Sequence, residues 1–121
     1  MTYSIDINKD DRYILITVHG KINREAATAI NAEAHALGKS NGINKYLEDL
    51  RDARNDDTIS NSYKFAYQDM KIETFDRFAR VAILVDSNDH SHDFIETVSK
   101  NAGFFLSLFT DQKEAIKYLL S

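Results

Sequence analysis

The sequence predicts an α/β fold, a mostly parallel sheet of about five strands that begins with an N-terminal antiparallel hairpin and is flanked by four helices. Three apolar runs, at residues 46–50, 81–85 and 104–109, each end in polar or acidic residues. The segments between these runs are long enough for helices, and strands that alternate with helices indicate a parallel sheet. A length of 121 residues fits one domain, residues 1–121.

The first two strands are predicted at residues 3–7 and 13–19. Only residues 8–12 separate them, and so short a turn makes the pair an antiparallel hairpin. Gly20 is expected to close the second strand.

The first helix is predicted over residues 24–37, with Asn23 as its N-cap. Small side chains dominate its buried face, which indicates close packing on the sheet: Ala26, Ile30, Ala34 and Leu37. Either Gly38 or Gly42 can end the helix. His35 is expected at the surface of the helix or at its boundary.

A third strand at residues 46–50 is expected to lead into a charged loop at residues 51–57. Asp57 or Thr58 then caps a second helix that runs to about Lys71. This helix is apolar over a wide arc, because the side chains on its main face are joined by two aromatic rings outside it: Ile59, Tyr63, Ala66 and Met70 on the face, and Phe65 and Tyr67 beside it.

The aliphatic run at residues 81–85 predicts a central strand that is buried on both faces. We expect Val81, Ile83 and Val85 to be nearly fully buried, together with Leu47.

The last third of the chain predicts two helices and one strand. After a loop at residues 87–92, a helix begins at Ser91 or Asp93 and ends near Ala102, before Gly103. Residues 104–109 form the last core strand. The capping pattern that begins at Asp111 starts a final helix through Leu120, with three side chains toward the core: Ala115, Tyr118 and Leu119.

Composition excludes several classes of function. The net charge of -4 argues against nonspecific nucleic-acid binding, which needs a basic surface. The absence of cysteine excludes disulfides, thiolate catalysis and cysteine-ligated metal centres. We find neither the apolar core of a signal peptide nor a membrane-spanning run, and we expect a cytoplasmic protein.

A family resemblance rests on five short segments spread over nearly the whole chain: residues 18–22, 47–51, 63–66, 80–85 and 109–115. In their order and spacing the chain resembles the STAS-like family, the small domains of bacterial anti-sigma-factor antagonists. It looks closest to the stand-alone branch that also resembles the CRAL-TRIO lipid-transfer fold. The resemblance implies a binding or regulatory domain without cofactors, and its lipid-transfer side implies an apolar ligand or contact with a membrane surface.

In the antagonist branch of that family, a phosphorylatable serine sits in an Asp-Ser-Ser-Gly-type turn that opens the second helix. The corresponding segment here is Asp56-Asp-Thr-Ile-Ser-Asn-Ser62, which lacks the Asp-Ser pair and the glycine. Thr58, Ser60 and Ser62 stand near that place. Ser60 and Ser62 are the candidate positions for a phospho-switch.

Two acidic groups offer an alternative function, that of a metal-dependent enzyme or a receiver-like phospho-switch. Carboxylates and imidazoles that can hold a divalent metal follow the strand at residues 81–85: Asp86, Asp89, His90, His92 and Asp93. His90 and His92 are two residues apart and would not share a helix face. A solvated loop is the competing interpretation, and we expect no metal site there.

The second group consists of Asp49, Asp52 and Asp86 at neighbouring strand ends, where a receiver-like site would add three more side chains: Ser87, Thr110 and Lys113. The competing interpretation is an ordinary polar strand end, with Asp49 paired to Arg51 or Arg54. No Gly-x-Ser-x-Gly elbow or phosphate-binding loop accompanies these groups.

The candidate binding site is the aromatic region of the second helix and the segment that follows it: Tyr63, Phe65, Tyr67, Met70, Phe75 and Phe78. A helix that is apolar over more than one face must bury the excess against something. Core packing, a second copy of the chain, an apolar ligand and a membrane surface are all open. The sequence predicts a non-catalytic binding or regulatory domain that engages a protein partner or an apolar small molecule or lipid near this helix.

Overall fold

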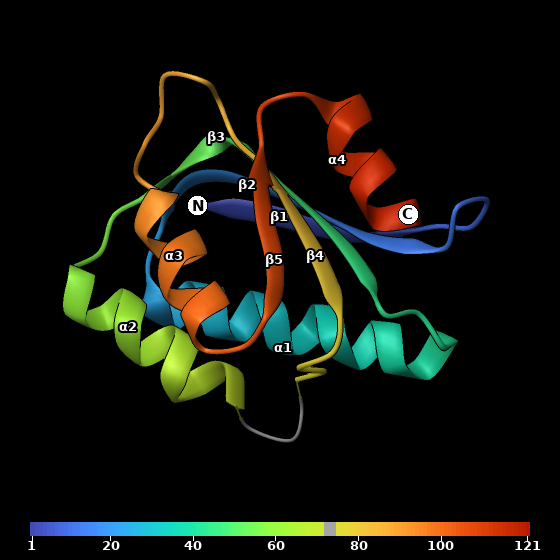
Figure 1. Ribbon diagram of the computed structural model, residues 1–121, viewed down its shortest axis with the longest axis horizontal. Coiled ribbons are helices and arrows are strands. Elements are labelled where there is room, and N and C mark those ends of the chain that lie inside the picture. The colour runs from blue at the N-terminus through green and yellow to red at the C-terminus, as the bar shows by residue number, and fades with distance from the viewer. Residues whose placement is uncertain (72–74) are drawn as a thin grey trace.

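The computed structural model describes residues 1–71 and 75–121, which form a five-stranded sheet between two layers of helices (Figure 1). Helices α1 (Arg24–Asn41), α2 (Ile59–Tyr67) and α3 (Asp93–Asn101) lie on one face of the sheet, and α4 (Gln112–Leu120) packs on the other. A short 3₁₀ turn, Asp69–Lys71, follows α2.

The strands lie in the same order in the sheet as in the chain: β1 (Thr2–Asn8), β2 (Tyr13–Ile22), β3 (Lys45–Asn55), β4 (Arg80–Leu84) and β5 (Phe105–Phe109). β1 and β2 are antiparallel, and every later pair is parallel. This topology confirms the predicted fold class, including the opening hairpin and the four helices.

Two strands extend further than predicted. β2 continues past Gly20 to Ile22, and β3 runs to Asn55, so the prediction of a loop at residues 51–57 was wrong. Between the pairs Thr17–Asp49 and His19–Asp52, β3 contains one residue more than β2. This β-bulge shifts the alternation of side chains along β3 by one residue. Leu50 and Ala53, which are three residues apart, are therefore both buried in the same core.

His35 was predicted at the surface of the helix or at its boundary, and the structure places it in the core, with 1% of its surface exposed. Its ring stacks on Tyr46 of β3, with 4.4 Å between the centroids, and meets the ring of Phe75 edge-on at 5.2 Å. The backbone N–H of Asp76 donates to Nδ1 of His35 at 3.0 Å. These aromatic contacts and the satisfied ring nitrogen explain why the histidine is buried.

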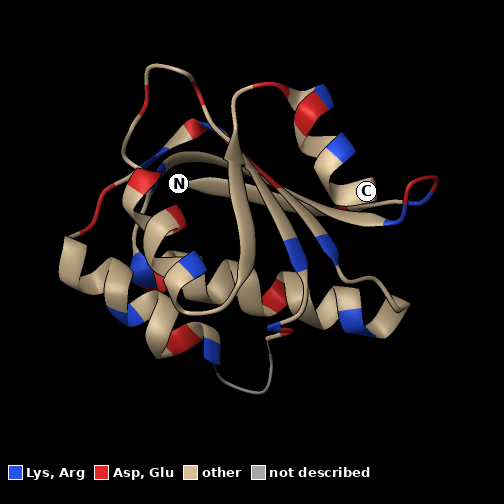
Figure 2. Cartoon of the chain, viewed as in Figure 1, with Lys and Arg blue, Asp and Glu red and all other residues tan. Residues whose placement is uncertain are grey.

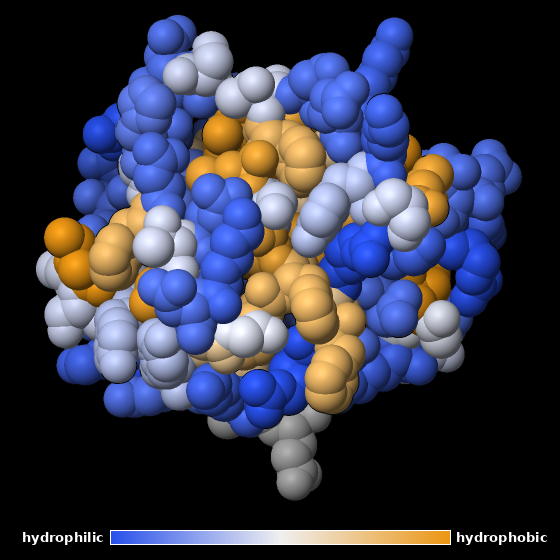
Figure 3. Space-filling model, in the orientation of Figure 1, coloured by the Kyte–Doolittle hydropathy of each residue, from blue (hydrophilic) through white to orange (hydrophobic). Residues whose placement is uncertain are grey.

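The predicted core is mostly confirmed. Ile83, Val85 and Leu47 are buried, and Ala115 and Leu119 of α4 are fully buried, whereas Val81 is only half-buried. The expectation of near-complete burial was therefore wrong for Val81. β4 is an internal strand, as predicted, but β5 lies at the edge of the sheet, and 54% of Phe105 is exposed. Apolar side chains gather over β5 in the middle of the face shown in Figure 3.

Candidate functional site

A cavity lies between the sheet and the helices α1, α2 and α3, and its volume is about 90 Å³. That volume is room for roughly six water molecules at about 15 Å³ each. Along α1 its wall runs from Arg24 to His35, which is roughly 16 Å of helix at 1.5 Å per residue. The cavity is therefore narrow and elongated.

The walls of this cavity are largely apolar. β2 and β4 contribute aliphatic side chains, α2 and the turn after it contribute Phe65 and Met70, and α3 and β5 close the far side: Ile16, Val18, Val81, Ile83, Ile95, Phe104 and Leu106. Val81 and Ile83 lie two residues apart on β4, and alternation along a strand places them on the same face.

A carboxyl group interrupts the apolar wall. Glu48 lies on β3 between Tyr46 and Leu50, on the face that α1 covers, and only 9% of it is exposed. Burial raises the pKa of Glu48 to about 7, and a hydrogen bond with the Asn31 side chain of α1 opposes part of that rise. The same Asn31 amide donates to the carbonyl of Ala27 at 2.8 Å, which fixes its direction.

His35 lines the cavity as well, and burial lowers its pKa from 6.5 to about 4. The ring is therefore neutral near neutral pH, with Nδ1 accepting from Asp76 and the proton on Nε2. A neutral imidazole and a buried carboxyl thus share one cavity.

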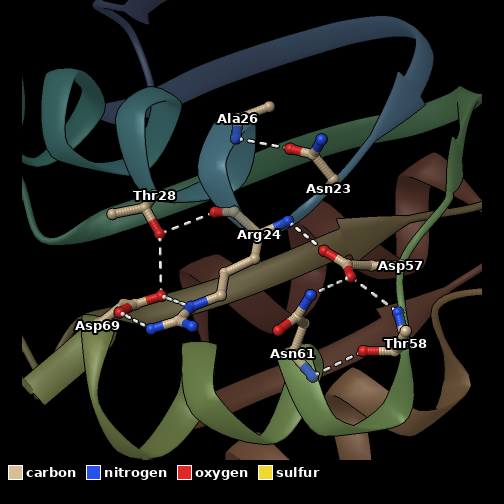
Figure 4. A network of polar contacts seen from close by, with 8 residues as sticks. All are labelled: Asn23, Arg24, Ala26, Thr28, Asp57, Thr58, Asn61 and Asp69. Atoms are coloured by element: carbon tan, nitrogen blue, oxygen red, sulfur yellow. Dashed lines mark hydrogen bonds and ion pairs between the residues drawn. The ribbon is translucent and has the colours of Figure 1, made fainter.

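Polar side chains form the end of the cavity at the start of α1 (Figure 4). The guanidinium of Arg24 donates to both oxygens of Asp69, at 2.7 and 2.9 Å, and these hydrogen bonds lower the pKa of Asp69. The backbone N–H of Arg24 donates to Asp57, which also accepts from the amide of Asn61 at 2.7 Å. This network ties the N-terminus of α1 to α2 and to the turn after it. Thr58 caps α2 by accepting from the N–H of Asn61 at 3.0 Å.

The predicted aromatic site residues divide into three groups. Phe65 and Met70 line the cavity. Phe75 is buried against His35, away from the solvent. Tyr63 and Phe78 face outward, and they are 51% and 74% exposed. Tyr67 is half-buried against Val98 of α3 and Ala102 at its end, and its ring stacks on Tyr63 with 4.4 Å between centroids.

The candidate phosphorylation positions differ in access. Ser60 is exposed in the first turn of α2, whereas Ser62 is buried and lines the cavity. A kinase needs an exposed hydroxyl, which leaves Ser60 as the accessible one of the two.

The acidic groups at the strand ends lie apart from the cavity. Asp86, Asp89, His90 and Asp93 border an open acidic groove with residues from the start of α4, and Figure 2 shows acidic residues along the loop between β4 and α3 and at the turn into α4. His92 instead points inward, and its Nε2 lies 2.8 Å from the carbonyl oxygen of Ala53. The two histidines therefore do not converge. Residues 1–71 and 75–121 hold no group of three or more His, Asp or Glu arranged to bind a metal ion.

The receiver-like set does not converge on one point either. Asp49 pairs with Arg51 at 2.8 Å, which lowers the pKa of Asp49, and Asp52 lies 3.4 Å from His19. Ser87 and Thr110 border the acidic groove together with Asp86. Lys113 is exposed on α4. The pairing of Asp49 with Arg51 is the competing interpretation that the sequence offered.

Sequence reasoning missed Glu48 and Asn31, the polar pair in the cavity wall. One signal was available for Glu48: strand alternation places it on the same face as Tyr46 and Leu50, which are buried. The adjacent Asp49 obscured this signal, because two consecutive carboxyls suggest a solvated strand end.

Among the described residues, none of the helices combines the length and the apolar character that crossing a membrane requires.

The sequence matches no family model, and no curated protein is detectably related to it. Solved structures do resemble it. An uncharacterized protein from Shewanella loihica PV-4, of the DUF3478 family with a SpoIIAA-like fold, has a TM-score of 0.57 and 18% identity, with 98% of this chain and 92% of that chain covered.

Two structures of the anti-sigma factor antagonist SpoIIAA are also similar. The unphosphorylated form has a TM-score of 0.53 and 12% identity, over 96% of both chains. The phosphorylated form, from Bacillus, has a TM-score of 0.52 and 13% identity, over 96% of this chain and 97% of that one. With the strand order and the helix layers described above, these similarities establish that the chain has a SpoIIAA-like fold.

Proposed function

We propose that this chain is a non-catalytic, cytoplasmic binding domain that takes a small apolar molecule into the cavity between α1, α2, α3 and the sheet. The observation that carries the proposal is the cavity itself. Apolar walls with a few convergent polar groups are typical of small-molecule sites. Phe65 and Met70, both in the region that the sequence singled out, are part of these walls.

Native mass spectrometry of the protein purified under mild conditions tests the proposal, because it reports a retained molecule directly. We expect a mass adduct that organic solvent releases. Binding of xenon and of 1-hexanol, followed by the NMR shifts of cavity amides, provides a second measurement, since apolar cavities take up xenon. If no adduct is seen and neither probe shifts the amides of cavity residues, the proposal is wrong.

A matched pair of substitutions on α1 locates the binding. Ala27 lines the cavity and Ala29 is exposed on the same helix. Ala27→Leu should fill part of the cavity and weaken hexanol binding, whereas Ala29→Leu should leave binding unchanged. Equal effects of the two changes would contradict binding inside the cavity.

Phe65 and Tyr63 form a second matched pair on α2. Phe65→Ser should reduce retention of the bound molecule more than it lowers the melting temperature, because Phe65 lines the cavity. Tyr63→Ser should leave retention unchanged, because Tyr63 does not line the cavity and is 51% exposed.

A protein partner is a second candidate, favoured by the outer side of α2. Ile59 and Tyr63 are 70% and 51% exposed and lie one turn apart, so they form an apolar ridge with Tyr67 beside them. The SpoIIAA structures that share this fold are of an anti-sigma factor antagonist, and a regulatory role by protein contact is consistent with that likeness. Size-exclusion chromatography of the wild type and of an Ile59→Ser, Tyr63→Ser double variant would show whether the ridge mediates self-association.

A further inference from the structure

The position of Glu48 gives the cavity a chemical preference beyond its apolar walls. The carboxyl is about nine-tenths buried and faces the cavity from β3. Asn31 supplies one hydrogen bond to it. A carboxylate has about four acceptor sites, so the group retains capacity for donors carried by a bound molecule.

The other ionisable side chains of the cavity wall also favour a bound molecule that carries hydrogen-bond donors. Asp57 and Asp76 add two carboxyls, and His35 is neutral because burial lowers its pKa to about 4. His92, the second imidazole of the wall, lies 2.8 Å from the carbonyl oxygen of Ala53.

Arg24 is the only lysine or arginine among the residues found to line the cavity, and its guanidinium already binds both oxygens of Asp69. A buried anionic group needs a partner cation or several donors to offset its desolvation. Among the described residues, the wall offers a carboxylate or phosphate head no comparable partner.

We propose that Glu48 selects, as the occupant of this cavity, an elongated apolar molecule whose polar end is an amine, and disfavours molecules that end in a carboxylate or a phosphate. The inference rests on the proposed function and specifies the class of ligand. The ammonium group donates to the Glu48 carboxylate, and the apolar body lies along the wall between α1 and β4. The rings of Phe65 and Phe104 line the same space and attract a cation through their faces.

The test compares probes that differ only in their polar end: hexylamine, 1-hexanol and hexanoate, with xenon as a probe that has no polar group. Binding to the wild-type chain is followed by the NMR shifts of cavity amides during titration. Charge-assisted hydrogen bonds are about twice as strong as neutral ones. We therefore expect hexylamine to bind about tenfold or more tightly than hexanoate, with hexanol between them.

Two substitutions on β3 separate a specific effect from the overall negative charge. Glu48→Gln keeps the shape of the side chain and removes its charge, so the preference for the amine should disappear while xenon still binds. Asp49→Asn removes the same charge from the neighbouring residue, whose side chain pairs with Arg51 on the opposite face, and it should leave the ranking unchanged. If Glu48→Gln does not fold, the comparison of hexylamine and hexanoate affinities for the wild-type chain decides whether the cavity prefers an amine.

The outcomes separate this inference from the proposed function. If xenon and hexanol bind but hexanoate binds as tightly as hexylamine, or if Glu48→Gln keeps the amine preference, the selection by Glu48 is wrong and the apolar cavity stands as a binding site. If none of the four probes shifts cavity amides, both are wrong.

Discussion

Gly38 of α1 lies directly against the phenol ring of Tyr46 of β3. A Cβ atom at position 38 would clash with the Tyr46 hydroxyl, and it would lie 2.9 Å from Cζ of Tyr46 and 2.8 Å from the carbonyl oxygen of Ile43. The helix can approach the sheet this closely because residue 38 has no side chain. Gly38 is thus a packing residue, and Gly42, with a φ of 64°, ends the helix.

Replacement of Gly38 by Ala should therefore destabilise the protein, by about 1–3 kcal/mol, as overpacking does. Helix propensity alone would predict the opposite, a gain of about 1 kcal/mol. Urea unfolding of the Gly38→Ala variant decides between the two, and a gain in stability would contradict the packing argument. The same substitution in a Tyr46→Phe background should cost less, since the hydroxyl, which is the atom nearest to the added Cβ, is removed.

The neutral His35 should make stability fall in acid. Its pKa is about 4 in the folded chain and 6.5 ordinarily. Between these values the unfolded chain binds a proton at this histidine and the folded chain does not, so its contribution to the unfolding free energy falls by about 1 kcal/mol per pH unit as pH is lowered from 6.5 to 4. Measured by urea unfolding, the stability of the wild type relative to His35→Gln should fall by about 1 kcal/mol per unit as pH is lowered over that range, because the variant should lose this contribution. Its stability relative to His19→Gln, a change at an exposed histidine, should not fall in this way.

Glu48 should act in the opposite direction. Its pKa is about 7 when folded and 4.5 ordinarily, so between these values the folded chain holds a proton that the unfolded chain has lost. Its contribution to the unfolding free energy is complete below pH 4.5 and falls by about 1 kcal/mol per unit as pH rises toward 7. In the wild type the two slopes largely cancel between pH 4.5 and 6.5. Glu48→Gln should expose the slope of His35, and a profile that stays flat in this variant would contradict the assignment.

Ile83→Ala should cost about 2–5 kcal/mol in unfolding free energy, because it removes buried methyl groups from an internal strand. Ile83 is 3% exposed and borders the cavity. Phe105→Ala on the edge strand β5 is the control and should cost less, since 54% of Phe105 is exposed. A loss below about half a kcal/mol for Ile83→Ala would show that its surroundings collapse into the space that it leaves.

The loop between β4 and α3 should not bind a divalent metal tightly. His90 is exposed and lies 3.1 Å from Asp93, while Nε2 of His92 is directed at the Ala53 carbonyl. Calorimetric titration with zinc and with manganese should show no tight one-to-one binding. Such binding, if it were abolished in the His90→Ala, His92→Ala double variant, would overturn this expectation.

The fold was predictable because apolar periodicity distinguishes strands from helices, and the short turn at residues 8–12 fixes the hairpin. The end of β3 was not predictable, because a bulge lets charged residues such as Arg51 and Arg54 continue a strand whose other face is buried. The burial of His35 depends on its stacking with Tyr46 and on a donor from Asp76, contacts between segments that a single sequence does not connect. The cavity arises from three helices and the sheet together, so only one part of its wall, Phe65 and Met70, was within reach of the sequence.

The bulge in β3 makes the number of residues in this strand a determinant of the cavity wall. Asn55 lines the cavity, and its amide holds the carbonyl oxygen of Ser91 at 3.1 Å. Glu48 and Asn55 are seven residues apart, and side chains at an odd spacing in a regular strand point to opposite faces. The extra residue of the bulge compensates for this odd spacing, so both side chains reach the cavity. A relative that retains this cavity should therefore keep both the bulge and the spacing between Glu48 and Asn55, or lack both the bulge and one of the residues between them.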